Sequence, residues 1–159
     1  MQAIDVPDLL PPPERARLQL GQRLHTPVGR GHIVWHAWGE RRPGVAPLVL
    51  FHGGSGSWTH WVKNIAPLVD AGRWVLAVDL PGFGDSDPPP DGNDADAMVQ
   101  PLAAGLRALL PGEAVDLVGF SFGGISPSAI CSLTFCQISG SRFTCSNVWK
   151  RSRSRSPFC

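Results

Sequence analysis

Short apolar runs recur along residues 18–122, and each ends in turn residues or leads into a helix-like pattern. Three of them are continuous and are typical of strands buried on both faces by helices: PLVLFH (47–52), RWVLAVD (73–79) and AVDLVGF (114–120). Two further strand-like runs lie between Leu18 and Glu40. The second, HIVWHAWG, alternates between its two faces as a half-buried antiparallel strand would.

Helical stripes separate the continuous runs. The first has apolar residues at i, i+4, i+7 and i+8 and closes at Gly72; its members are Trp61, Ile65, Leu68 and Val69. The second runs from Ala95 to Leu110, and we expect Pro101 to kink or delay that helix. Strands that alternate with helices predict βαβ units. The fold class is therefore α/β, with a mostly parallel sheet and helices on both faces.

The composition changes abruptly after residue 121. Residues 1–121 hold 9 Lys and Arg against all 13 Asp and Glu, a formal net charge of −4, whereas residues 122–159 hold 5 Lys and Arg and no acid, hence +5. All five His precede the change and all four Cys follow it. We therefore predict three segments: a Pro-rich N-terminal tail (1–17), a partial α/β domain (18–125) and a Ser/Cys/Arg-rich tail (126–159).

Several functional classes find no support in the composition. No run approaches the ~20 apolar residues of a membrane span, and the N-terminus lacks the apolar stretch of a secretory signal. We therefore expect a cytoplasmic protein with reduced thiols. The Cys spacing contains no CxxC, so no metal site is predicted, and no cofactor is implied. The basic run KRSRSRS (150–156) is too short to predict nucleic-acid binding.

The strongest chemical signal is a G-x-S-x-G pentapeptide, GFSFG, at the end of the third buried run. A strand that feeds a helix through a very sharp turn needs residues without side chains two positions before and after the central serine. Gly119 and Gly123 meet that need. Such a turn lifts the Ser121 hydroxyl above the sheet edge, where the backbone N–H of Phe122 can face a developing oxyanion. We expect strained backbone dihedrals at Ser121.

A second oxyanion donor is expected in the loop HGGSGSW, which follows the first buried run. Gly53 and Gly54 allow the backbone to approach a reacting carbonyl, and the N–H of Gly54 is the candidate donor. His52 in this loop could serve as a catalytic base. Its position beside the donors instead favours a role in holding the loop by hydrogen bonds.

In this order the segments HGG, DLPGFGDSD and GFSFGG resemble the α/β-hydrolase superfamily, over about residues 25–125. The resemblance implies an ester or other carbonyl substrate of small size, Ser121 as nucleophile of an acyl-enzyme, and Gly54 and Phe122 as oxyanion donors. Asp79 would anchor the turn that follows it, PGFG (81–84). In this family the sharp turn around the central serine is called the nucleophile elbow. Epoxide hydrolases and dehalogenases of the superfamily carry Asp at this position, so the serine of this chain argues against both activities.

The chain departs from the family pattern after the elbow. Family triads run Ser, acid, His, but no Asp, Glu or His follows Ser121. The remaining histidines (His25, His32, His36 and His60) come too early, and we expect them to be surface or loop residues. The alternative interpretation is therefore a non-catalytic fragment, truncated after the elbow, that is itself inactive.

The C-terminal segment is expected to contribute little to the fold. Pro127 falls beyond the first turn of the helix behind Ser121, and no amphipathic stripe follows it. We predict that residues from about 126 onward are poorly ordered and do not complete the sheet. The third buried strand would then keep an open edge, through which the protein could self-associate.

Overall fold

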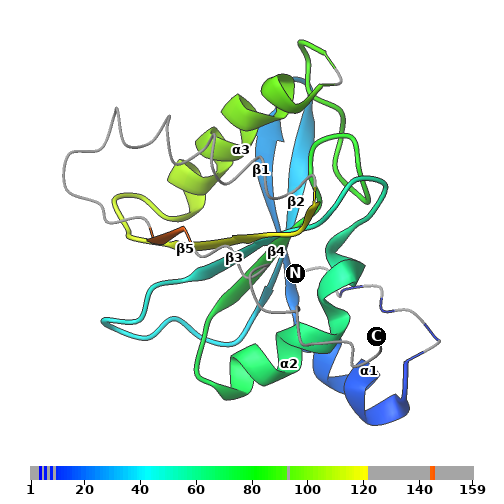
Figure 1. Ribbon diagram of the computed structural model, residues 1–159, viewed down its shortest axis with the longest axis vertical. Coiled ribbons are helices and arrows are strands. Elements are labelled where there is room, and N and C mark those ends of the chain that lie inside the picture. Colours follow the sequence, from blue (N-terminus) through cyan, green and yellow to red (C-terminus); the bar gives the residue numbers. More distant parts are fainter. Residues whose placement is uncertain are drawn as a thin grey trace, which may run out of the picture.

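The architecture is a mixed six-stranded sheet with helices on both faces, seen in a computed structural model of the chain (Figure 1). The structure describes residues 4, 6, 8, 10–92, 94–121 and 144–145. The strand order is β1-β2-β4-β3-β5-β6. Strands β3, β4, β5 and β6 pair in parallel, whereas β1 and β2 join the sheet antiparallel. The α/β class and the mostly parallel core predicted from the sequence are confirmed.

Strands and helices follow one another in the predicted order through the body of the chain. The strands are β1 (Gln22–Val28), β2 (Gly31–Trp38), β3 (Leu48–Phe51), β4 (Val75–Val78), β5 (Asp116–Gly119) and β6 (Thr144–Cys145). The helices are α1 (Pro12–Leu18), the 3-10 turn η1 (Trp58–Trp61), α2 (Val62–Asp70) and α3 (Ala95–Leu109).

Alternate residues of the central strands feed two separate cores. Val49 and Phe51 of β3 join the core under α3, whereas Leu48 and Leu50 join the core under α1 and α2. The residues of β4 divide in the same way. Figure 1 shows α3 on one side of the sheet and α1 and α2 on the other. Because both faces of these strands are buried, the runs are apolar at every position.

Two local expectations differ from the structure. The run predicted to be half-buried, now β2, is buried at every position from Ile33 to Trp38 because both of its faces are covered. Trp35 packs in the core under α3, and Trp38 packs in the core under α1 and α2. Helix α3 continues through Pro101 instead of starting after it. Asp94 caps that helix by accepting the N–H of Ala97 at 2.9 Å, and burial of the face around Leu102 offsets the missing backbone hydrogen bond.

The N-terminal residues also differ from the predicted tail. Pro12–Leu18 form a helix, with a proline in its first turn where a missing N–H costs nothing. Leu18 is fully buried, and Ile4 and Val6 pack in the same core. Trp38 fixes this segment by donating its indole N–H to the Leu18 carbonyl over 2.8 Å.

At the other edge of the sheet, Thr144 and Cys145 pair with Asp116 and Leu117 of β5. These two residues therefore add to the sheet, contrary to the expectation for the segment after 126. The rest of 122–159 lies outside the described residues, so the predicted boundary at 125 stays a prediction. None of the helices in the described part of the chain is long and apolar enough to cross a membrane.

Candidate active site

Ser121 lies two residues beyond the end of β5, in a left-handed backbone conformation with φ of 54°. A side chain in this region costs about 1–2 kcal/mol relative to the right-handed conformation. The expectation of a strained backbone at Ser121 is confirmed. Gly119 is the last residue of β5, as predicted, whereas Phe122 and Gly123 lie outside the described residues.

The loop after β3 lies directly against the residue that precedes Ser121. Phe120 donates its N–H to the Phe51 carbonyl at 3.1 Å, which extends the pairing of β3 and β5 to the point where both chains turn. A Cβ atom on Gly53 would come within 3.0 Å of the Phe120 ring and 3.4 Å of its carbonyl oxygen. A side chain at position 53 would therefore require the Phe120 ring to shift by a few tenths of an ångström.

His52 is fully buried, and both of its ring nitrogens contact the backbone. Nε2 lies 2.9 Å from the N–H of Leu80, which can only donate, and Nδ1 lies 2.6 Å from the Gly53 carbonyl, which can only accept. The ring is therefore neutral with its proton on Nδ1. Burial lowers the pKa of His52, outweighing the Gly53 hydrogen bond and the charge of Asp79, which raise it. The prediction that His52 holds the loop is confirmed.

His60, on η1, faces the same loop from the outside. Its Nδ1 lies 3.3 Å from the N–H of Gly53, and its ring meets the rings of His52 and Phe120 edge to face at 5.9 and 6.0 Å. With Trp61, Asn64 and Phe120 it lines a cavity of about 340 Å³. This open space lies beside the residue that precedes Ser121.

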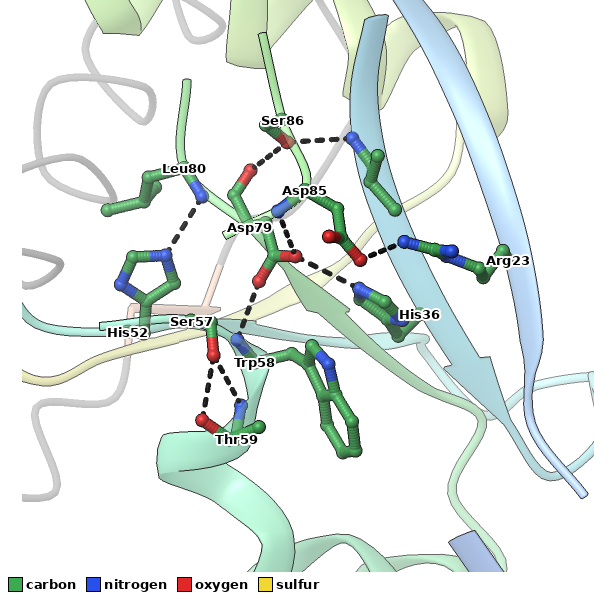
Figure 2. A network of polar contacts seen from close by, with 11 residues as sticks. Arg23, His36, His52, Ser57, Trp58, Thr59, Asp79, Leu80, Asp85 and Ser86 are labelled. Carbon is green, nitrogen blue, oxygen red and sulfur yellow. Dashed lines mark hydrogen bonds and ion pairs between the residues drawn. The ribbon is translucent and has the colours of Figure 1, made fainter. Parts of the chain in front are cut away.

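Asp79, at the end of β4, is the centre of a buried polar network (Figure 2). One carboxylate oxygen accepts the N–H of Trp58 at 2.7 Å, at the start of η1. The other accepts the N–H of Asp85 at 3.1 Å, beyond the PGFG turn, and faces Nε2 of His36 at 3.1 Å. Asp79 therefore ties the loop after β3 to the turn after β4, which is the anchoring role expected of it.

The expectation that the early histidines are surface or loop residues is wrong for His36. This side chain is 1% exposed in the middle of β2, between the rings of Trp38 and Trp58. No local pattern marks His36, because only the antiparallel pairing of β2 with β4 brings it to Asp79. His25, His32 and His60 are exposed, as expected.

His36, Asp79 and Asp85 could be mistaken for a metal centre because their donor atoms lie within 4.8 Å of one another. Each group, however, already has a protein partner. Asp79 accepts from His36 and from two backbone amides, and Asp85 forms an ion pair with Arg23. These contacts explain why the three side chains lie close together.

Comparison with known proteins identifies the family. The sequence model of a protein family described as alpha/beta hydrolase fold matches residues 46–126 of this chain. These residues run from the start of β3 to just beyond Ser121. The chain belongs to this family. The match covers both the loop after β3 and the elbow after β5.

Curated relatives include several hydrolases. A 2-hydroxy-6-oxononadienedioate/2-hydroxy-6-oxononatrienedioate hydrolase of Cupriavidus pinatubonensis is 36% identical over 89 residues, which cover 54% of this chain and 31% of that protein. An esterase of Mycobacterium tuberculosis is 37% identical over 107 residues, or 67% of this chain and 34% of that protein. The chain thus spans about a third of the length of the curated relatives it matches.

Solved structures agree on the fold. An epoxide hydrolase from Vigna radiata superposes with a TM-score of 0.64 at 23% identity, covering 79% of this chain and 37% of that one. A bacterial membrane phospholipase A superposes with the same TM-score at 26% identity, covering 79% and 39%. These structures therefore share the α/β-hydrolase fold with the chain.

Proposed function

We propose that Ser121 is the nucleophile of a serine hydrolase that acts on a small ester or on a carbon–carbon bond next to a carbonyl group. In this reaction the Ser121 hydroxyl oxygen attacks the carbonyl carbon, and its proton passes to a base. The leaving group departs from an acyl-enzyme, which water then hydrolyses. The observation that carries the proposal is the left-handed backbone of Ser121 directly after a buried parallel strand.

The loop after β3 supports an oxyanion site beside this serine. Gly53 uses both its N–H and its carbonyl for the rings of His60 and His52. In the described part of the chain, the N–H of Gly54 makes no hydrogen bond, and the residue is exposed. Gly54 is therefore the donor that we assign from this loop, with Phe122 as its expected counterpart. Loss of one such donor typically lowers the rate by ~10²–10³.

The relatives leave more than one nucleophile chemistry open. Esterases and carbon–carbon bond hydrolases occur among them, and so does a soluble epoxide hydrolase of Corynebacterium, 37% identical over 78 residues. The residue at the elbow decides between these chemistries. A serine there favours acyl transfer at a carbonyl carbon, because ring opening of an epoxide through an ester intermediate needs a carboxylate nucleophile.

A second candidate is a chain that keeps the fold but does not turn over substrate. No Asp, Glu or His follows Ser121, and His52, the His nearest in sequence to the proposed donors, has both nitrogens bonded to the backbone. A hydroxyl without a base is a weak nucleophile. We therefore propose that the 159-residue chain by itself hydrolyses esters poorly or not at all.

Replacing the oxygen nucleophile by sulfur tests the site without a base. A thiol is a few per cent thiolate at pH 7, so Ser121→Cys removes the need for proton abstraction. We expect 4-nitrophenyl acetate to acylate position 121 at least tenfold faster than position 55 in the matched variant Ser55→Cys, because only position 121 faces the oxyanion donors. Peptide mass spectrometry separates both sites from the four native cysteines. Equal rates at the two sites would contradict the proposal.

A further inference from the structure

The peptide groups of Gly53 are held from two sides by histidine rings. His52 approaches from the interior, where its Nδ1–H donates to the Gly53 carbonyl at 2.6 Å. His60 approaches from the surface, where its Nδ1 accepts the Gly53 N–H at 3.3 Å. The two rings meet each other edge to face at 5.9 Å.

The hydrogen bonds require opposite proton positions on the two rings. A neutral imidazole carries one N–H donor and one acceptor nitrogen. His52 accepts at Nε2 from Leu80, so its proton is on Nδ1. His60 accepts at Nδ1 from an N–H that can only donate, so its proton is on Nε2. Two histidines eight positions apart thus hold the two peptide groups on either side of the Gly53 Cα, one as the Nδ1–H and the other as the Nε2–H tautomer.

We propose that His60 is a positioning residue for oxyanion stabilisation. Its Nδ1 accepts the hydrogen bond of the Gly53 N–H. The N–H of the next residue, Gly54, then remains to face a substrate carbonyl. His60 also keeps Gly53 against Phe120, the residue before Ser121, because the His60 ring contacts both. This inference rests on the proposed function of Ser121 and adds a residue that the triad pattern does not contain.

The arrangement holds only while His60 is neutral. A proton on Nδ1 would set two N–H donors against each other, so protonated His60 releases the Gly53 N–H. Within the described residues, the titratable group that packs on His60 is His52, and the charge of Asp79 reaches His52 from β4. Phe120 and Gly56 also lie against the His60 ring, and neither carries a charge.

Nuclear magnetic resonance of the ¹⁵N-labelled full chain tests the inference without any substrate. Long-range proton–nitrogen spectra of the imidazole rings report each tautomer. We expect Nε2–H for His60 and Nδ1–H for His52. We also expect the Gly53 amide to be protected from hydrogen exchange through His60, and the Leu80 amide through His52.

Two variants separate positioning from simple space filling. His60→Phe keeps an aromatic ring against Phe120 but has no acceptor, and the protection of the Gly53 amide should fall about fivefold, the size expected for one hydrogen bond. His60→Asn places an amide oxygen near the position of Nδ1. It should restore most of that protection.

An Nδ1–H tautomer at His60, or a Gly53 amide whose protection is unchanged in His60→Phe, would overturn the inference. These readouts do not depend on acylation of Ser121. The role of His60 can therefore fail while Ser121 is acylated as proposed, and Ser121 can fail to react while His60 holds Gly53 as inferred.

Discussion

The backbone N–H of Leu80 donates to Nε2 of His52 over 2.9 Å, so the first residue after the Asp79 anchor is bonded to the first residue of the loop after β3. This contact joins the carboxyl ends of two neighbouring parallel strands, β3 and β4 (Figure 2). It requires a neutral ring, because a protonated His52 has no lone pair to accept the Leu80 N–H.

Stability should therefore fall as the pH is lowered below about 6.5. The ordinary pKa of a histidine is 6.5, and burial lowers the pKa of His52 in the folded protein. Between the two values the unfolded chain binds a proton that the folded chain does not, so the free energy of unfolding decreases with falling pH and is constant above that window.

Urea unfolding at pH 7.5 and 5.5 measures this dependence. In His52→Gln the amide oxygen can still accept the Leu80 N–H but does not titrate, so the loss between the two pH values should be smaller than in the wild type. Asn64→Gln, at an exposed residue that does not titrate, is the control and should keep the full loss. An undiminished pH dependence in His52→Gln would show that His52 does not carry the effect.

Asp79→Asn should destabilise the fold by about 2–3 kcal/mol. The carboxylate accepts two backbone N–H groups and faces Nε2 of His36. An amide offers one acceptor oxygen and turns its NH₂ group toward another donor, so at least one buried donor loses its partner. Chemical denaturation measures the change. Asp91→Asn, at an exposed carboxylate, is the control and should alter the free energy of unfolding by less than about 0.5 kcal/mol. Equal effects of the two substitutions would show that Asp79 does not anchor the turn.

Gly84→Ala should be more damaging than Gly112→Ala. Both glycines have positive φ, 53° and 70°, so both variants carry the cost of a left-handed side chain. At Gly84 the added Cβ would also lie 2.4 Å from the Asp79 carboxyl carbon, whereas nothing lies within 4 Å at Gly112. Thermal melts of the two variants should differ by several degrees. Matching melts would mean that the PGFG turn does not close on Asp79.

Ser121→Gly should be more stable than Ser121→Ala by about 1 kcal/mol, because glycine adopts a φ of 54° without steric cost. The same pair of substitutions at Ser86, a serine outside the left-handed region, should favour alanine. Urea midpoints of the four variants provide the comparison. A more stable alanine at both positions would show that the backbone of residue 121 is not strained.

The central strands and both long helices could be predicted because their apolar patterns reflect local burial. Val49 and Leu76 lie in runs that are apolar on both faces, and the stripe around Leu102 has helical spacing. The glycines of the two loops and Asp79 stand at strand ends, where parallel topology gathers them. These features of the site follow from chain order alone.

Other features depend on partners far away in the sequence. His36 has no distinguishing local pattern. It becomes a hydrogen-bond partner of Asp79 only through the pairing of β2 with β4. Helix α1 lacks periodicity because one residue, Leu18, anchors most of it. His60 resembles a surface residue, and only the fold brings its Nδ1 to Gly53. The pairing of Thr144 with Asp116 likewise has no signal in the Ser-rich segment.

Site-resolved acylation of the wild-type chain tests the role of Ser121 most directly. Both formation and hydrolysis of an acyl-enzyme need a base, so an acyl group that reaches Ser121 should remain there and accumulate. After prolonged incubation with 4-nitrophenyl acetate, peptide mass spectrometry should find the acetyl group on Ser121 well above its level on Ser55, an exposed serine of the neighbouring loop. Acetyl groups spread evenly over the two serines, or a Ser121 that stays unmodified while Ser55 reacts, would contradict the account.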